Sequence, residues 1–211
     1  MLPISETLTR RAVARAVGDR QEAYADELQR IVDATYRVIE RTGTVDPTLR
    51  DILREAGLST QAFYRYFTSK DELLLVLLDD GARRLVGYLE HRMERASSPE
   101  GQVRAWIAGV LAQAANEGAA RRTRPFVANE ARLAEHFPEE QRASVDLLVG
   151  LLVPPIVSLT GDRRADAGRD AEAVYQLAFG ALRRHLTRGT VPSRAEVEHV
   201  SRFALAGIAA S

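Results

Sequence analysis

The stretch that decides the fold is "DPTLRDILREAGLSTQAFYRYFTSKDELL", residues 46–74. It predicts two short helices, over residues 48–56 and 59–67, joined by a tight turn that contains Gly57. Ser59 suits the N-cap of the second helix, and Ser69 suits the N-cap of a longer helix over residues 70–95. Two short helices with a turn of this length are typical of a helix-turn-helix, whose second helix enters the major groove of DNA.

The second short helix has two faces of different chemistry. The side chains predicted to face the core are Ala62, Phe63 and Phe67. The side chains predicted to face outward are Thr60, Gln61, Tyr64 and Arg65. Glutamine can bond an adenine edge with two hydrogen bonds and arginine can do so with guanine, whereas hydroxyl groups suit phosphate oxygens. The outward face therefore has the side chains that DNA recognition requires.

The rest of the chain is also helical in its periodicity and contains no strand-like alternation of useful length. We expect an all-α protein of about nine helices. The predicted ranges are 21–42, 48–56, 59–67, 70–95, 100–117, 120–135, 139–160, 168–188 and 193–209. Gly43 marks the end of the first range, and Pro154-Pro155 must kink or interrupt the helix predicted over 139–160. Residues 1–20 contain four arginines, and they form either a short helix, a frayed terminus or a basic arm that supplements DNA binding.

The segment at 46–74 resembles the DNA-binding domain of the TetR family of bacterial transcriptional regulators. The family pattern is a helix followed by T-x-x-x-I-A-x-x-A-G-V-S-x-G-T-L-Y-x-Y-F-x-S-K-x-x-L. The positions that match, in register and without gaps, are Thr48, Ile52, Ala56, Gly57, Ser59, Tyr64, Tyr66, Phe67, Ser69, Lys70 and Leu73. The resemblance implies a DNA-binding domain over residues 21–85, a ligand-binding and dimerisation domain over 86–211, and an arm over 1–20.

The resemblance also implies which residues contact operator DNA: Thr48, Arg50, Ser59, Thr60, Gln61, Ala62, Tyr64, Arg65, Tyr66 and Lys70. Gln61 replaces the small residue of the pattern, so we expect it to contact a base. Lys70 is the only lysine in the chain, and we expect its flexible ammonium to reach a phosphate. The alternative is that these are ordinary surface residues of a helical hairpin.

A small-molecule effector is the second expected partner. Its pocket would lie among the helices between residues 70 and 180, and the candidate lining residues are Tyr88, Trp106, Val110, Phe126, Asn129, Leu133, Leu152, Tyr175 and Phe179. Such residues are equally explained as plain core, but a lining of this kind would favour a lipophilic effector. The run "RRTRPF", residues 121–126, is either an anion-binding site or a solvated loop.

Members of the family are usually homodimers, which predicts an interface on the last two helices. The expected residues form one stripe on each helix: Val174, Ala178, Ala181, His185, Val197, Val200, Ala204 and Ile208. The alternative is a seam inside the core of one chain. Two identical heads related by a two-fold axis would suit a pseudo-palindromic operator.

Composition excludes several other classes. The 211 residues contain no cysteine, which favours a cytoplasmic location and excludes thiolate metal sites. Their formal net charge is zero, which argues against a protein that is basic over its whole surface. No apolar run is long enough to span a membrane as a helix, and no signal peptide is recognisable. The four histidines have no metal-ligand spacing, and no catalytic motif is present, so we expect no metal, no cofactor and no enzymatic activity. The expected function is a ligand-responsive repressor; the alternatives are a protein of this fold that binds a protein partner and, less favoured, an all-α enzyme.

Overall fold

The computed structural model describes residues 4–161 and 166–210, with side chains described over 23–161 and 166–210. Within these ranges the chain folds into ten helices and no strand, which confirms the all-α prediction. One more helix is present than expected, because the range 139–160 forms two helices. These are α7, Pro138–Gly150, and α8, Val153–Thr160, which are bent by 47° relative to each other. Pro154 and Pro155 lie in the first turn of α8, where a missing N–H costs least.

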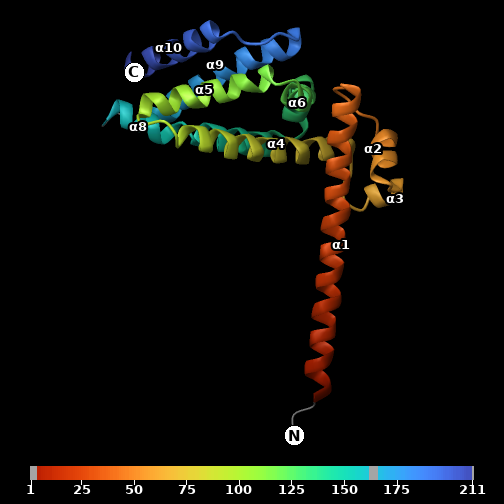
Figure 1. Ribbon diagram of the computed structural model, residues 1–211. Helices are drawn as coiled ribbons and strands as arrows, with labels where there is room; N and C mark the ends of the chain where they lie inside the picture. The colour runs from red at the N-terminus through yellow and green to blue at the C-terminus, as the bar shows by residue number, and fades with distance from the viewer. Residues whose placement is uncertain (1–3, 162–165, 211) are drawn as a thin grey trace.

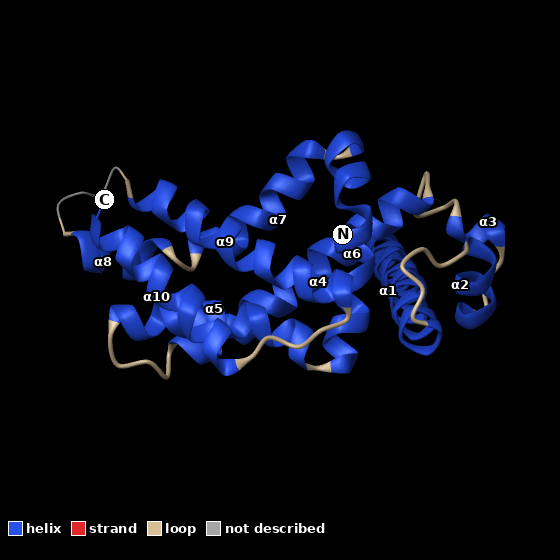
Figure 2. Cartoon of the chain, turned by 90° about the horizontal axis from the view of Figure 1, so that it is seen from above, coloured by secondary structure: helices blue, strands red, loops and turns tan. Residues whose placement is uncertain are grey.

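The first three helices form the helix-turn-helix part of the molecule. α1 spans Ile4–Thr42, α2 spans Leu49–Ala56 and α3 spans Thr60–Phe63. The helix predicted from residue 21 therefore begins at Ile4. The four arginines at the start of the chain have side chains outside the described residues. α2 and α3 lie on the side of α1 that faces away from the rest of the molecule (Figures 1 and 2).

The remaining helices form an elongated body. α4 spans Lys70–Met93, α5 spans Pro99–Ala115 and α6 spans Glu117–His136. α9 spans Ala167–Arg188 and α10 spans Arg194–Ala210. α5 is the central helix of the body, since it packs against α4, α6, α8, α9 and α10. α4 runs from the helix-turn-helix into the body, and α6 contacts both parts (Figure 1).

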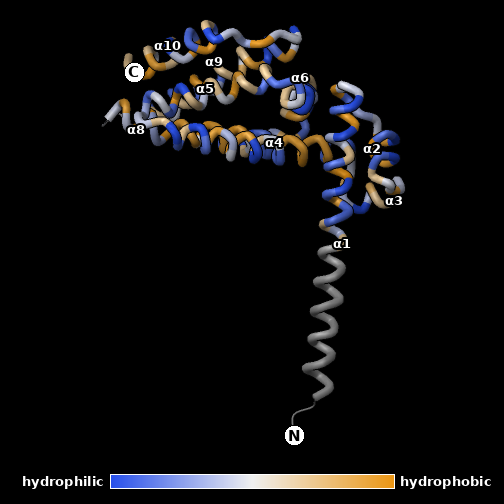
Figure 3. The backbone as a smooth tube through the Cα atoms, in the orientation of Figure 1, coloured by the Kyte–Doolittle hydropathy of each residue, from blue (hydrophilic) through white to orange (hydrophobic). Residues whose placement is uncertain are grey.

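Two apolar clusters stabilise the molecule. Hydrophobic and hydrophilic residues alternate along the helices of both parts (Figure 3). The smaller cluster holds the helix-turn-helix together and includes Phe63, Phe67 and Leu77, all at most 2% exposed. The larger cluster fills the body around Trp106, which is fully buried. Burial of this apolar area is the main favourable term in folding. α4 contributes to both clusters, with Leu77 in the smaller one and Leu89 in the larger one.

Within the described part of the chain, no single helix is long and apolar enough to cross a membrane. The bent pair α7 and α8 passes that test only when the two are taken together, and both helices contribute buried residues to the larger cluster.

Candidate DNA-binding surface and effector cavity

The turn between α2 and α3 is built as its sequence predicts. Gly57 ends α2 in the left-handed conformation, with φ of 65°, and its N–H donates to the Leu53 carbonyl. The Ser59 hydroxyl caps α3 by accepting a hydrogen bond of 3.1 Å from the Ala62 N–H. The Ser69 hydroxyl caps α4 in the same way, at 3.1 Å from the Glu72 N–H. These caps fix where each helix begins and so fix which side chains project outward.

α3 is shorter than the predicted range of 59–67, because the chain leaves α-helical geometry after Phe63. Its outward side chains are nevertheless those expected: Thr60, Gln61, Tyr64 and Arg65 are exposed, and Tyr64 is 59% exposed. Ala62 is only 5% exposed and belongs to the core. A side chain in that position cannot reach a base edge, so we remove Ala62 from the candidate set.

Glu27 of α1 holds two of the candidate residues in place. Its Oε2 accepts hydrogen bonds from Arg65 Nη2 at 2.9 Å and from Tyr66 Oη at 2.7 Å. Burial, and then the hydrogen bond to Glu27, raise the pKa of Tyr66 to about 12. Tyr66 therefore stays neutral and keeps its proton at physiological pH. No local pattern points to Glu27, since it lies 38 positions before Arg65 on another helix.

The start of α2 brings Thr48 and Arg50 to the same surface, and both are exposed. The Thr48 hydroxyl caps α2 by accepting from the Asp51 N–H at 3.1 Å and donates to Asp51 Oδ2 at 2.7 Å. This hydrogen bond and the nearby Arg54 lower the pKa of Asp51. The hydroxyl expected to contact phosphate is thus engaged by its own helix, whereas Arg50, in the first turn of α2, is exposed.

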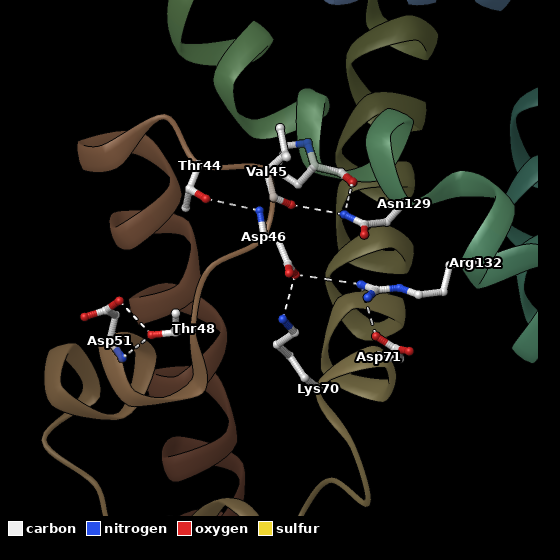
Figure 4. Close-up of polar contacts among 10 residues, drawn as sticks. Thr44, Val45, Asp46, Thr48, Asp51, Lys70, Asp71, Asn129 and Arg132 are labelled. Atoms are coloured by element: carbon white, nitrogen blue, oxygen red, sulfur yellow. Dashed lines mark hydrogen bonds and ion pairs between the residues drawn. The ribbon is translucent and has the colours of Figure 1, made fainter.

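Lys70 lies in a polar network that joins three segments (Figure 4). Its Nζ is 2.6 Å from Oδ1 of Asp46, in the loop between α1 and α2. Arg132 of α6 approaches the same carboxylate oxygen at 3.8 Å and contacts Oδ1 of Asp71 at 3.2 Å. Asn129 of α6 donates to the Val45 carbonyl at 3.0 Å. We call this network, made of Val45, Asp46, Lys70, Asp71, Asn129 and Arg132, the α6 latch.

A second set of contacts joins α6 to the end of α1. Arg121 Nη1 donates to the Glu40 carbonyl at 2.8 Å, and Arg122 Nη1 lies 2.6 Å from Glu40 Oε1. The run at 121–126 is therefore part of a helix, and the solvated loop we considered for it is wrong. The physical reason is that Asn116 caps α6 upstream of the run, and Pro125 is accommodated within the helix.

A cavity of about 730 Å³ lies in the body between α4, α5, α6, α7 and α9. Five of the nine residues expected to line it do so: Tyr88, Phe126, Leu133, Tyr175 and Phe179. The rings of Tyr175 and Phe179 stack with centroids 4.3 Å apart. Burial, and then the charge of Glu130, raise the pKa of Tyr175, so its hydroxyl is neutral. The cavity has the size and the mostly apolar lining of a small-molecule site.

The other four expected residues do not line the cavity. Trp106, Val110 and Leu152 are fully buried core residues, and Trp106 Nε1 donates to the Leu148 carbonyl at 3.2 Å. Asn129 belongs to the α6 latch. Periodicity could not separate these residues from lining residues, because core and cavity positions share the same helix faces. Among the described residues, no group of three or more His, Asp or Glu side chains could hold a metal ion.

The stripes expected at the dimer interface point into the chain's own core. Val174, Ala178, Ala181, Val200, Ala204 and Ile208 are at most 7% exposed and belong to the larger cluster, and Val197 packs against it. His185 is 7% exposed, with Nδ1 2.8 Å from Thr190 Oγ1 and Nε2 3.0 Å from Glu196 Oε2. The interface assigned to these residues is therefore wrong. They form the internal seam, because α9 and α10 bury this side against α5 and α8.

The fold and the two sites define the class of helix-turn-helix DNA-binding regulators. A family model described as bacterial regulatory proteins, tetR family, matches residues 31–77. The HTH-type transcriptional regulator BetI of Brucella suis is 30% identical over 167 residues, covering 78% of this chain and 82% of that protein. The chain belongs to the TetR family and is a transcriptional regulator that binds DNA, not an enzyme.

Solved structures share the fold across both parts of the molecule. A TetR transcription regulator from Haloarcula marismortui has a TM-score of 0.65 and 23% identity, covering 88% of this chain and 97% of that one. The fatty acid degradation regulator FadR from Bacillus halodurans has a TM-score of 0.64 and 20% identity, covering 86% and 95%.

Proposed function

We propose that this regulator is a repressor whose two copies bind a pseudo-palindromic operator and whose effector, held in the cavity, lowers operator affinity. The observation that carries the proposal is α6, which lines the cavity with Phe126 and Leu133 and touches the helix-turn-helix through Asn129 and Arg132. One helix is therefore in contact with both sites. Its position can depend on the cavity and affect the DNA-binding surface.

The proposed DNA-binding surface consists of α3, the start of α2 and the start of α4. Gln61 is exposed at the start of α3, where its amide can bond an adenine edge. Tyr64 and Arg50 are also exposed, and Tyr64 has the hydroxyl that suits a backbone phosphate. Glu27 competes with DNA for Arg65, so we assign Arg65 and Tyr66 mainly to positioning α3 against α1.

The proposed coupling follows from how α6 is held. The α6 latch ties α6 to the α1–α2 loop and to the first turn of α4 (Figure 4). An effector that binds one arrangement of α6 more tightly than another must shift the equilibrium between them. Because the latch includes Lys70 and Asp71, a shift of α6 changes how the helix-turn-helix is set on the body.

The proposed homodimer uses the outward faces of α9 and α10 in place of the buried stripes. Phe203 of α10 is 65% exposed, and Ala206 and Gly207 are exposed three and four residues further along the same helix. Gly180 is exposed on α9. A large exposed aromatic residue beside small residues lets two copies of a helix pair approach closely. A dimer would present two heads to one operator, and this role places the protein in the cytoplasm with the DNA.

The experiment that tests the function is DNA binding against salt. Labelled fragments that tile the DNA upstream of the protein's own coding region are titrated by fluorescence anisotropy. We expect one fragment to bind more tightly than a shuffled sequence, with affinity falling by about 1,000-fold or more between 50 and 200 mM salt as phosphate contacts are lost. A protein-binding role for this surface would give no preferred fragment and no steep salt dependence.

A further inference from the structure

The wall of the cavity carries an excess of positive charge. Three arginines line it, Arg84, Arg122 and Arg183, against one carboxylate, Glu130. Charges that face a partly enclosed apolar space are screened less than charges on an open surface. The lining side chains, taken without their partners outside the cavity, therefore favour an anion over a cation.

Each of these arginines already contacts a carboxylate of its own chain. Arg84 pairs with Asp80 of its own helix at 2.9 Å, and Arg183 of α9 pairs with Glu130 of α6 at 2.9 Å. The Asp80 carboxylate also accepts a hydrogen bond of 3.1 Å from Tyr36 Oη of α1. Arg122 differs, because its partner is Glu40 at the end of α1, at 2.6 Å. Glu40 does not line the cavity, so one face of Arg122 is held by the helix-turn-helix part while the side chain also borders the cavity.

We propose that the effector is an amphipathic acid, with an apolar body and one anionic group that takes Arg122 from Glu40. The inference rests on the proposed function of the cavity as the effector site and names the chemical class that it accepts. The apolar body would lie against Phe126, Leu148, Tyr175 and Phe179, which line the same space. A carboxylate can bond a guanidinium through two parallel hydrogen bonds, which gives the exchange its geometric specificity.

The exchange is favourable because the resident pair is weak. The side chains of Arg122 and Glu40 are 47% and 41% exposed, and ion pairs exposed to this degree contribute little net stability. An anion whose apolar body occupies the cavity lies within reach of Arg122, which lines the same space. Its binding removes a contact between α6 and α1, which leaves the Arg121 bond to the Glu40 carbonyl as the nearest link.

The test compares matched ligands that differ only in the charged group. Dodecanoate is compared with dodecanol, and 2-naphthoate with 2-naphthalenemethanol, by titration calorimetry on the full chain. In at least one pair we expect the acid to bind about tenfold more tightly or better. Arg122→Gln should bring acid and alcohol to within about threefold while the alcohol binds as before. Arg124→Gln is the control, since Arg124 lies on the same helix and does not line this cavity.

Glu40→Gln provides an opposite change. It removes the competing carboxylate, so we expect it to tighten binding of the acid and leave the alcohol unchanged. Equal binding of acid and alcohol in both pairs, no binding of either acid, or an acid preference that survives Arg122→Gln would overturn the proposal. Failure of this inference is distinct from failure of the proposed function. A protein that binds the upstream DNA but shows no acid preference keeps the proposed function and loses the inference. A protein that prefers the acid but binds no upstream fragment keeps the acid site and loses the proposed function.

Discussion

Lys70 illustrates how one residue combines a position in the fold with a proposed contact to DNA. Its ammonium is held by Oδ1 of Asp46, and the Arg132 guanidinium approaches the same oxygen at 3.8 Å. A compact ammonium on a flexible stem fits beside it and can turn toward a phosphate, whereas a second planar guanidinium would have to share the space. The pairing accounts for a lysine in a chain whose other fixed positive charges are arginines.

Lys70→Gln tests whether that ammonium also reaches DNA. If it neutralises a phosphate, the variant should weaken binding about equally for all DNA sequences, and the slope of log affinity against log salt should shrink by about 1 for each copy that binds. Gln61→Ala should instead change the preference among sequences. Anisotropy titrations at four salt concentrations measure both. An unchanged slope for Lys70→Gln would show that Lys70 makes no phosphate contact and acts only within the α6 latch.

Glu55 of α2 makes helix-turn-helix stability depend on pH. Hydrogen bonds from Arg41, at 2.5 Å, and Arg37, at 3.0 Å, lower the pKa of Glu55. Because the folded-state pKa lies below the unfolded one, the contribution is complete above the unfolded value, about 4.3, and is lost as pH falls through the folded value. Glu55→Gln should lower Tm at pH 7 and have no effect well below pH 4. Thermal melts across this range decide it, and a Tm difference that grows toward low pH would contradict the assignment.

Residues with local roles were the predictable ones. Ser59 and Ser69 were expected as caps because their partners lie three positions away. The inward faces of Phe63 and Phe67 followed from helical spacing. Glu27 was missed, since its pairing with α3 depends on how α1 packs in three dimensions. Contacts between distant segments leave no local pattern.

At the scale of helices, α6 carries the connection between the two parts of the molecule. Its range was predicted within three residues at the start and one at the end, from 120–135 to Glu117–His136. Its role was not predicted, because the arginines of the run at 121–126 resembled those of a solvated loop. Their partners are a carbonyl and a carboxylate of Glu40, at the end of α1. Only the assembled fold shows that the run faces another element.

The contact between α4 and α5 depends on Gly109. A Cβ at Gly109 would lie 2.5 Å from Cδ2 of Leu89, whose side chain is fully buried, so the surrounding packing would have to shift. Gly109→Ala should therefore lower the free energy of unfolding by about 1–3 kcal/mol, the usual cost of overpacking. Gly87→Ala is the matched control on α4, where a Cβ meets nothing within 4 Å.

We expect Gly87→Ala to raise stability by about 0.5–1 kcal/mol through helix propensity. Urea unfolding of both variants provides the measurement. A neutral or stabilising Gly109→Ala would show that α4 and α5 are less closely packed than the structure has them.

At the scale of the whole molecule, the open question of assembly now concerns the outer faces of α9 and α10. Sequence periodicity identified the apolar stripe of each helix, and both stripes are buried within one chain. A single sequence shows which residues seek burial but does not show whether its own helices or a second copy cover them. On α10, the large apolar side chain of Phe203 is not covered by the chain's own helices and is 65% exposed.

Phe203→Asp tests the proposed dimer. A charge at the centre of an apolar contact must be desolvated without a partner, so the variant should sediment as a monomer at micromolar concentrations at which the wild type is a dimer. Val191→Asp is the control, because Val191 is similarly exposed at 63% but lies in the loop between α9 and α10. A Phe203→Asp variant that remains dimeric would place the interface elsewhere. A wild type that is monomeric would contradict the proposed dimer.

The central claim is that α3 presents its outward side chains to DNA, and the most direct test is operator affinity of the Gln61→Ala/Tyr64→Ala double variant. Both side chains are exposed, and the Tyr64 ring meets the Phe63 ring edge-on with centroids 5.3 Å apart. Helical content and Tm are therefore measured alongside, and we expect the variant to remain folded. Gln102→Ala on α5 serves as the control. We expect at least about a tenfold loss of affinity for the preferred upstream fragment, since one lost base contact alone costs about 1–3 kcal/mol. A double variant that is folded and binds that fragment as tightly as the wild type would contradict it.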